Sequence, residues 1–164
     1  MDDPTLQRLR EASGLRLDAE GRFWHQGDLV EHQRTREALH RGLHRAPDGR
    51  WATRIGGEWG YVAVDDAAFF VQRIEPDPAL PGALRLWLEG GEEESVAAAS
   101  ICSGARDALY LRLASGERAI LRRPAQVSLS GLLREEGGRF VIALGGIRFA
   151  IGADGGPEAV RLVV

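Results

Sequence analysis

The chain has 164 residues and a formal net charge of −3 at pH 7. This length suits one domain, or two small joined ones, with a buried core. The acidic balance argues against a nucleic-acid polymer as partner, because such a partner requires a basic stripe. No apolar run reaches the roughly 18 residues of a membrane span, so we expect no membrane partner. The single cysteine, Cys102, excludes an internal disulfide and, together with a polar N-terminus unlike a secretory signal, favours a cytoplasmic location.

All 21 Lys or Arg residues of the chain are arginine. A phosphate-binding loop with its lysine and a Schiff-base lysine are therefore both excluded. No other motif of the sequence predicts a bound cofactor, so we expect none.

The first part of the chain predicts short helices and strands. Pro4 opens a helix that ends before Gly14. Residues 15–26, LRLDAEGRFWHQ, predict two strands joined by a turn. A helical spacing of apolar residues follows over 34–45.

The middle of the chain predicts a hairpin and then a linker. RWATRI and EWGYVAV alternate as strands do, and Gly56-Gly57 between them is a two-residue turn of the kind that hairpins prefer. AFFVQRI predicts the next strand, and EPDPALPG predicts a linker. We therefore divide the chain into residues 1–76 and 77–164, with extra antiparallel strands at LRLWLEG, SVAAASIC and ALYLRLA.

The second half of the sequence repeats the first. One ungapped shift lays HRAPDGRWATRIGGEWGYVAVDD on LREEGGRFVIALGGIRFAIGADG, so that Gly56-Gly57 meets Gly145-Gly146 and Asp65 meets Asp154. The same shift brings Val71 onto Val160 in the closing strands. We infer an α+β fold of two duplicated strand-helix-hairpin-strand units packed together, with mostly antiparallel sheet.

The glycine pairs could cradle a phosphate or could form turns. A phosphate cradle requires the N-terminus of a helix, whereas a strand follows each pair here. Because both copies carry the pair, we interpret it as a hairpin turn in which glycine supplies a positive φ. The run Gly90 to Glu94 is likewise predicted to be a solvated hairpin turn.

Three residues of the second predicted helix could bind a divalent metal. Glu37, His40 and His44 share one helical face, but no HExxH motif or Cys/His cluster accompanies them. The second copy has two leucines at the histidine positions, which favours histidines packed against the core. We predict no metal site.

Asp65 and Asp66 could form a carboxylate pair for acid–base catalysis, but no nucleophile or second base accompanies them. Only Asp65 recurs in the second copy, which favours a turn-capping role for it. Cys102 has no motif around it and is predicted to be a small packed side chain. We therefore expect a protein that is not an enzyme.

Aromatic residues are unevenly divided between the copies. Trp24, Trp59 and Tyr61 fall opposite Leu113, Arg148 and Ala150. Aromatic side chains near arginines are typical of nucleotide or protein recognition, but ordinary core residues beside a solvated surface give the same pattern.

Two segments of the chain, GRFWHQGDLVEHQRTREALHRGLHRAPDGRW and GYVAVDDAAFFVQ, resemble an uncharacterised bacterial family, domain of unknown function 1285. ALYLRLASGERAILRRPAQVSLSGLLREEGG is similar to the family's second half. The resemblance covers roughly residues 15–155. It implies a duplicated α+β core, a C-terminal half superficially like a pleckstrin-homology fold, and a groove that holds a nucleotide-like ligand in signal transduction.

We therefore predict a non-enzymatic binding or regulatory module with a groove between its two halves. A nucleotide-like small molecule is the first candidate ligand, and the alternative is a protein partner held by exposed aromatic side chains. The oligomeric state stays open. The predicted binding residues are Arg34, Arg54, Glu58, Trp59, Tyr61 and Asp66.

Overall fold

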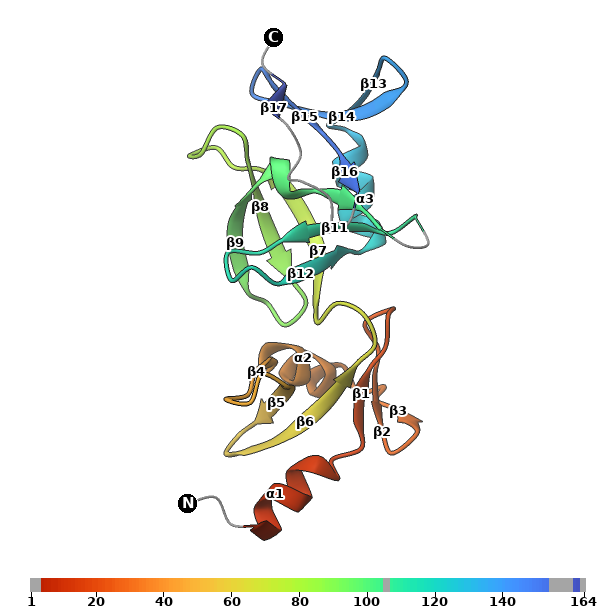
Figure 1. The fold of residues 1–164 in the computed structure, drawn as a ribbon, viewed down its shortest axis with the longest axis vertical. Helices are drawn as coiled ribbons and strands as arrows, with labels where there is room; N and C mark the ends of the chain where they lie inside the picture. Colours follow the sequence, from red (N-terminus) through yellow and green to blue (C-terminus); the bar gives the residue numbers. More distant parts are fainter. Residues whose placement is uncertain (1–3, 105–106, 154–160, 163–164) are drawn as a thin grey trace. The chain divides into compact units, whose positions relative to one another are not determined.

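The computed structural model describes residues 4–104, 107–153 and 161–162 (Figure 1). It contains two compact units: unit 1 comprises residues 1–68 and 89–91, and unit 2 comprises residues 69–88 and 92–164. The division falls before Phe69, whereas the sequence placed it after residue 76. The strand that begins at Phe69 belongs with unit 2 because both of its neighbouring strands lie there.

The described part of unit 1 is one sheet with two helices. The strands follow the order β3-β2-β1-β6-β5-β4, and only the β1–β6 pair is parallel. The elements are α1 (Pro4–Glu11), β1 (Leu15–Leu17), β2 (Phe23–His25), β3 (Asp28–Leu29), α2 (Gln33–Arg41), β4 (His44–Arg45), β5 (Trp51–Ile55) and β6 (Glu58–Val64).

Helix α2 is shorter than the sequence predicted, because tertiary contacts end it at Arg41 instead of Arg45. A Cβ atom on Gly42 would lie 2.1 Å from the carbonyl oxygen of Arg54, so the backbone approaches β5 more closely there than a side chain allows. The Arg54 amide also donates to the Gly42 carbonyl, at 3.2 Å. Residues 44–45 then pair with β5 as the edge strand β4.

Unit 2 contains a seven-stranded sheet, a four-stranded sheet and one α-helix among its described residues. The seven-stranded sheet follows the order β16-β10-β11-β12-β7-β8-β9 and is curled (Figure 1), and the other follows the order β13-β14-β15-β17. The elements are β7 (Phe69–Pro76), β8 (Ala83–Leu88), β9 (Glu93–Ala97), the 3-10 turn η1 (Ala98–Ser100), β10 (Cys102–Ser103), β11 (Leu109–Arg112), β12 (Arg118–Leu121), α3 (Arg123–Ser130), β13 (Leu133–Glu136), β14 (Arg139–Leu144), β15 (Ile147–Ala150), β16 (Gly152–Ala153) and β17 (Arg161–Leu162).

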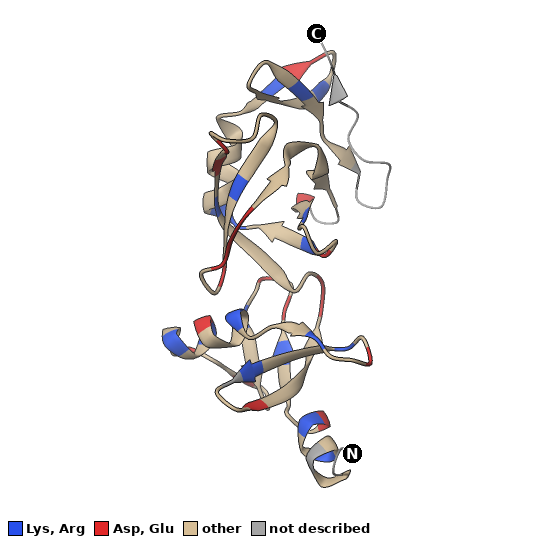
Figure 2. Cartoon of the chain, turned by 90° about the vertical axis from the view of Figure 1, so that its left-hand side faces the viewer, with Lys and Arg blue, Asp and Glu red and all other residues tan. Residues whose placement is uncertain are grey.

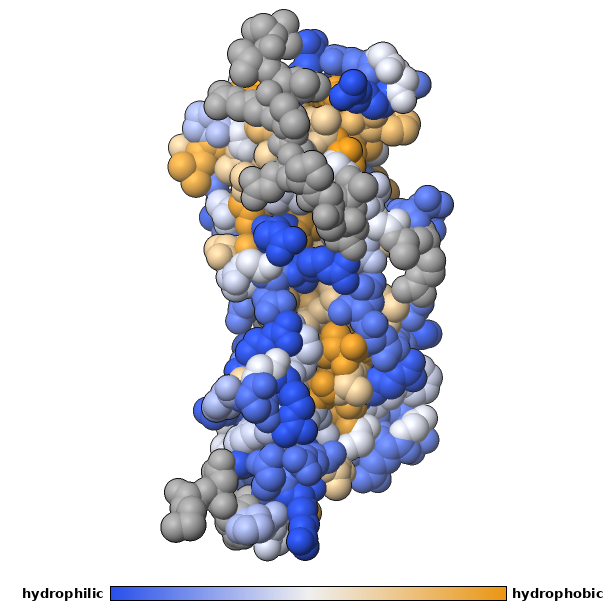
Figure 3. All heavy atoms as spheres, viewed as in Figure 1, coloured by the Kyte–Doolittle hydropathy of each residue, from blue (hydrophilic) through white to orange (hydrophobic). Residues whose placement is uncertain are grey.

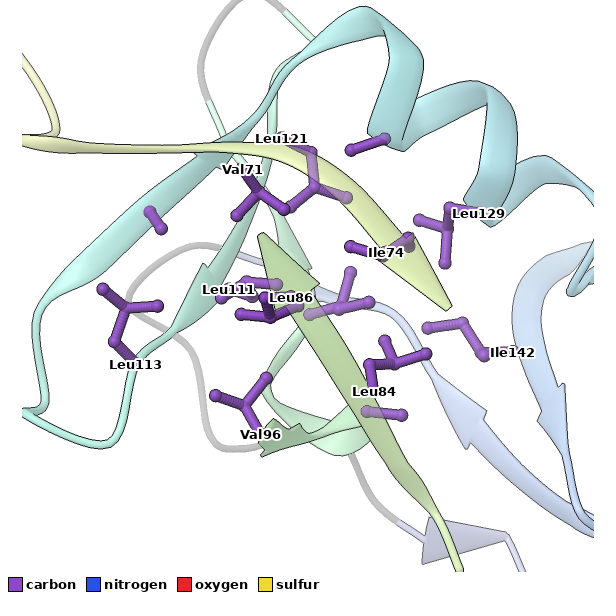
Figure 4. Packing of buried hydrophobic residues seen from close by; sticks show 14 of the residues in the cluster. Val71, Ile74, Leu84, Leu86, Val96, Leu111, Leu113, Leu121, Leu129 and Ile142 are labelled. Atoms are coloured by element: carbon purple, nitrogen blue, oxygen red, sulfur yellow. The ribbon is translucent and has the colours of Figure 1, made fainter. Parts of the chain in front are cut away.

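The core of unit 2 fills the space between the curled sheet, α3 and the β14–β15 hairpin, which is called the second hairpin below (Figure 4). Val71, Leu84 and Leu86 contribute from β7 and β8, and Leu129 contributes from α3. Ile142 of β14 is fully buried in the same cluster. The second hairpin is therefore part of the core of unit 2.

The predicted α+β fold with mostly antiparallel sheet is confirmed. Both glycine pairs form hairpin turns, and the turn between β8 and β9 is also as predicted. The segment EPDPALPG is not a linker, since it connects the two antiparallel strands β7 and β8. Asp154 and Val160, which the repeat matches to Asp65 and Val71, lie outside the described residues.

Candidate functional site

All six predicted binding residues belong to unit 1. The four that gather on the β5–β6 hairpin are Arg54, Glu58, Trp59 and Tyr61. Arg34 is exposed on α2, and the half-buried Asp66 follows β6. These two line neither of the hollows described below. The groove expected between the two halves stays a prediction.

An apolar groove of about 380 Å³ lies within unit 1. Its apolar walls are Leu9 of α1, Leu15 of β1, Val30, Leu39 of α2 and Trp59 of β6. Apolar residues also reach the surface of this unit between hydrophilic flanks in Figure 3. Volume and lining match those of small-molecule sites, which are concave and mostly apolar with a few polar groups.

Two small residues keep the apolar groove open. Thr53 and Gly60 are direct partners across the β5–β6 hairpin, and both line the groove. The Thr53 hydroxyl donates to the Leu39 carbonyl at 2.7 Å. A Cβ atom on Gly60 would lie 2.9 Å from the Cβ of Ser13, so no larger residue fits there without movement. The groove therefore depends on the absence of a side chain at residue 60.

Helix α1 closes the end of the apolar groove. Within β6, strand β1 pairs only with Val62–Val64, so among the described strands the first part of β6 has no neighbour on that side. There the Ser13 hydroxyl donates to the Tyr61 carbonyl. Leu9 and Ser13 both line the groove, so the α1 segment supplies one of its walls.

A second, polar hollow of about 470 Å³ lies on the other side of the hairpin. Direct cross-strand partners share a face of a sheet, so Arg54 and Trp59 point to one side and Thr53 and Gly60 to the other. The side chains that line this polar hollow include Gln7, Arg10, His44, Asp48, Arg54 and Tyr61. Trp59 lines both the groove and the hollow.

Trp59 and Tyr61 are half-buried, which corrects the expectation of exposed aromatic side chains. The Arg10 guanidinium lies 3.9 Å from the centre of the Trp59 ring, and Arg50 lies 3.6 Å from that of Tyr61. The two rings contact each other edge to face at 5.3 Å. Much of this aromatic surface therefore holds unit 1 together.

Asp48 ties the Tyr61 side chain to the loop before β5. Its carboxylate accepts hydrogen bonds from the Arg50 side chain at 2.9 Å and from the Tyr61 hydroxyl at 2.8 Å. The bonds from Arg50, followed by the one from Tyr61, lower the pKa of Asp48 to about 2. Acidic and basic residues are interspersed over unit 1 (Figure 2), and this cluster is one example of their pairing.

Asp65 and Asp66 do not act as a matched carboxylate pair. Both carboxylate oxygens of Asp65 share the Arg16 Nε–H, at 3.0 and 3.1 Å, and Asp65 accepts a second hydrogen bond from Arg16 Nη2. The bond from Arg16 lowers the pKa of Asp65, so this carboxylate stays ionised and joins β1 to the end of β6. Asp65 is therefore poorly suited to act as a general acid near neutral pH.

Glu37, His40 and His44, which were predicted to share one helical face, belong to two different elements. His40 lies on α2, is 6% exposed and packs edge to face on Phe23, as the packed alternative predicted. His44 belongs to β4, and its Nδ1 lies 2.8 Å from the Gly42 carbonyl. Glu37 accepts a hydrogen bond from Gln33 at 2.8 Å. Among the residues that the structure describes, no three His, Cys, Asp or Glu side chains are grouped to hold a metal ion.

The buried carboxylate of Asp18, which is 3% exposed, was not predicted from the sequence. It accepts hydrogen bonds from the Arg22 amide at 2.8 Å, the Arg22 side chain at 2.8 Å and the Trp24 indole at 2.9 Å. Burial alone would raise the pKa of Asp18, but the bonds from Trp24 and Arg22 outweigh it and lower that pKa. The signal was the turn DAEGRFW, in which an aspartate precedes a glycine and an indole donor.

The apolar groove was also missed, although the repeat carried a signal for it. Thr53 and Gly60 align with Ile142 and Phe149, so the first copy is smaller at two positions that face each other. Leu9 and Arg10 lie outside the repeated segment, and nothing in the local pattern relates them to β6.

Comparisons with known proteins identify the fold. No protein-family model and no curated protein matches the sequence. A crystal structure of a DUF1285 family protein from Silicibacter pomeroyi is similar, with a TM-score of 0.62 and 19% identity over 85% of this chain and 80% of that one. A DUF1285 family protein from Shewanella baltica has a TM-score of 0.52 and 20% identity over 68% of this chain and 85% of that one. The resemblance to domain of unknown function 1285 is thus confirmed at the level of the fold. No helix in the described ranges is long and apolar enough to cross a membrane.

Proposed function

We propose that the chain is a divergent member of the DUF1285 family and acts as a binding module, with a small-molecule site in the apolar groove of unit 1. In this proposal the module is regulatory rather than enzymatic. A ligand in the groove touches both the α1 segment and the sheet, so its binding stabilises their attachment. Such a coupling is suited to signal transduction, which the family resemblance implies.

The proposal includes a duplication of one structural unit. In unit 1 the strands follow β3-β2-β1-β6-β5-β4, and in unit 2 the pairings β12-β11-β10-β16 and β15-β14-β13 follow the same course. The β1–β6 pair and the β10–β16 pair, which correspond in this course, are both parallel. In chain order, α2 lies between β3 and β4, and α3 lies between the corresponding strands β12 and β13. The likeness of the C-terminal half to a pleckstrin-homology fold remains a proposal from the family resemblance.

One observation is the main support for a ligand site in the apolar groove. The two hairpins have the same register, with Thr53 opposite Gly60 in the first and Ile142 opposite Phe149 in the second. Ile142 is 0% exposed and Phe149 is 5% exposed, so in unit 2 these side chains are part of the core. In unit 1 the same positions border the apolar groove. A hollow where the related hairpin has core side chains favours a site for a ligand over a packing defect, since protein cores are otherwise closely packed.

Binding is favoured over catalysis by the state of the carboxylates. Asp65 is held by Arg16 and Asp48 by Arg50, with the pKa of both lowered, so neither is adapted to exchange protons near neutral pH. A nucleotide-like ligand, the first candidate from the sequence, would fit the polar hollow instead of the apolar groove, with its phosphates beside Arg10 and Arg54.

A thermal-shift screen tests the proposal. Small aromatic and aliphatic molecules, together with nucleotides, are screened against the full chain, because a ligand selective for the folded state raises its melting temperature. Val30 lines the groove and is half-buried, so Val30→Phe should fill it and abolish the shift. Leu29→Phe, at an exposed neighbouring position outside the lining, is the matched control and should keep it.

Two results would contradict the assignment. A flat response of the wild-type chain to the whole panel would refute the small-molecule site. A shift that survives Val30→Phe but disappears in Arg54→Ala would move the site to the polar hollow, with Arg34→Ala as control for the loss of one exposed arginine.

A protein partner is the second candidate, favoured by exposed apolar residues near the groove. Leu9 is 64% exposed on α1 and Leu29 is 40% exposed on β3. A binding partner lost in Leu9→Glu but retained in Val30→Phe would favour this reading, since only the former changes the outer surface of α1.

A further inference from the structure

We propose that the ligand of the apolar groove is a cationic amphipathic molecule, an amine with an apolar body, whose ammonium group pairs with Glu58. This inference rests on the proposed function and specifies the chemical class of its ligand. It follows from the charges that line the groove and from the surroundings of Glu58.

The titratable side chains that line the apolar groove are Glu58 and His25. Among the residues that the structure describes, no arginine lines it, although the chain contains 21 Lys or Arg residues and several lie on neighbouring strands. With neutral histidine the walls therefore carry one negative charge. A phosphate or carboxylate placed in this groove would face Glu58, with no described arginine among the lining residues to compensate it.

Glu58 itself has an exposed side chain at the start of β6. Its carboxylate makes no hydrogen bond or ion pair with any residue that the structure describes, whereas other acidic side chains near the hairpin are paired. Asp48 is bonded to Arg50, and Glu11 lies 3.4 Å from the same guanidinium. The carboxylate of Glu58 is thus left available at the rim of an apolar hollow.

The two hairpins differ at this position in the way that the proposal requires. Glu58 corresponds in register to Ile147, which packs against the core of unit 2. Only the first hairpin therefore combines a hollow with a charged rim. An apolar body in the groove and an ammonium group at Glu58 would satisfy both features.

Three probes that share one apolar body test the charge of the ligand. Phenylpropylamine, phenylpropionamide and phenylpropionate differ in the head group and are titrated calorimetrically into the full chain. The amine should bind about tenfold more tightly than the carboxylate, with the amide between them, a ratio equivalent to about 1.4 kcal/mol. The advantage of the amine should shrink at high salt, because the rim of the groove is in contact with solvent.

Glu58→Gln should remove the preference for the amine while leaving the affinity of the amide unchanged. Glu31→Gln makes the same change of net charge at an exposed position outside the lining and should keep the preference. Equal affinities of amine and amide in the wild-type chain, or tighter binding of the carboxylate, would overturn this inference and leave the groove as a ligand site. Absence of binding by all three probes would overturn the inference and count against the proposed function as well.

Discussion

Replacing Gly60 with alanine tests how unit 1 is built around the apolar groove. The new Cβ would lie 2.9 Å from Ser13 Cβ and 3.6 Å from the Arg10 carbonyl oxygen. Carbon atoms in contact are about 3.5–4.0 Å apart, so the α1 segment must move by roughly 0.6–1 Å. Overpacking of this kind costs about 1–3 kcal/mol. Reduced freedom of the unfolded chain offsets about 0.4–1 kcal/mol of it, so we expect a net loss of about 1–2 kcal/mol.

Urea denaturation followed by tryptophan fluorescence measures this loss. Three of the four tryptophans, Trp24, Trp51 and Trp59, belong to unit 1, so the signal reports mainly on that unit. Gly57→Ala is the matched control, because a Cβ atom there meets nothing within 4 Å and its φ is not in the left-handed region. Because the reduced freedom of the unfolded chain is there opposed by no overpacking, we expect the control to be as stable as the wild type or more stable by up to about 1 kcal/mol.

A double-mutant cycle identifies the contact responsible. Ser13→Gly removes the Cβ that the new alanine would meet, and also the hydroxyl that donates to the Tyr61 carbonyl. Alone it should cost about 1 kcal/mol through the lost hydrogen bond. Combined with Gly60→Ala it should cost about 1 kcal/mol less than the sum of the two single changes. Strict additivity, or a Gly60→Ala chain as stable as Gly57→Ala, would refute the reasoning.

Two further predictions concern carboxylates of unit 1. Because the pKa of Asp48 is lowered from 3.8 to about 2, its stabilising effect is present above pH 3.8 and is lost as the pH falls toward 2. Wild type should therefore be more stable than Asp48→Asn at pH 7, and urea midpoints measured down the pH scale should converge below pH 3.8. Asp18→Ala should cost about 3 kcal/mol, since it leaves the Trp24 indole and the Arg22 amide without their acceptor. Asp28→Ala, at an exposed position, should change the unfolding free energy by less than about 0.5 kcal/mol.

The hairpins were predictable because their signals are local. Alternating apolar residues and a glycine pair define the two strands and the turn, and these features lie within a few residues of one another. The end of α2 was not predictable from local sequence. Residues 42–45 continue a helical apolar pattern, but the contact of Gly42 with Arg54 and the pairing of β4 with β5 override it.

The candidate site was predictable only in part. Unequal copies directed attention to Glu58 and Trp59, which both line the apolar groove. The sequence could not reveal that Leu9 and Ser13 would complete it, because their contact with β6 joins segments far apart in the chain. It also could not show that arginines would cover the aromatic rings, since pairs such as Arg10 and Trp59 follow no fixed spacing.

The comparison of the two hairpins explains why a groove exists in unit 1 at all. In unit 2 the position equivalent to Gly60 carries the buried ring of Phe149, which fills the space above the strand with its own side chain. In unit 1 the segment after α1 occupies part of that space and approaches residue 60 more closely than any side chain would allow. A segment from outside the β5–β6 hairpin therefore lies where the β14–β15 hairpin has a side chain of its own. The segment contacts residue 60 but does not fill the rest of that space, and the space that remains is the apolar groove.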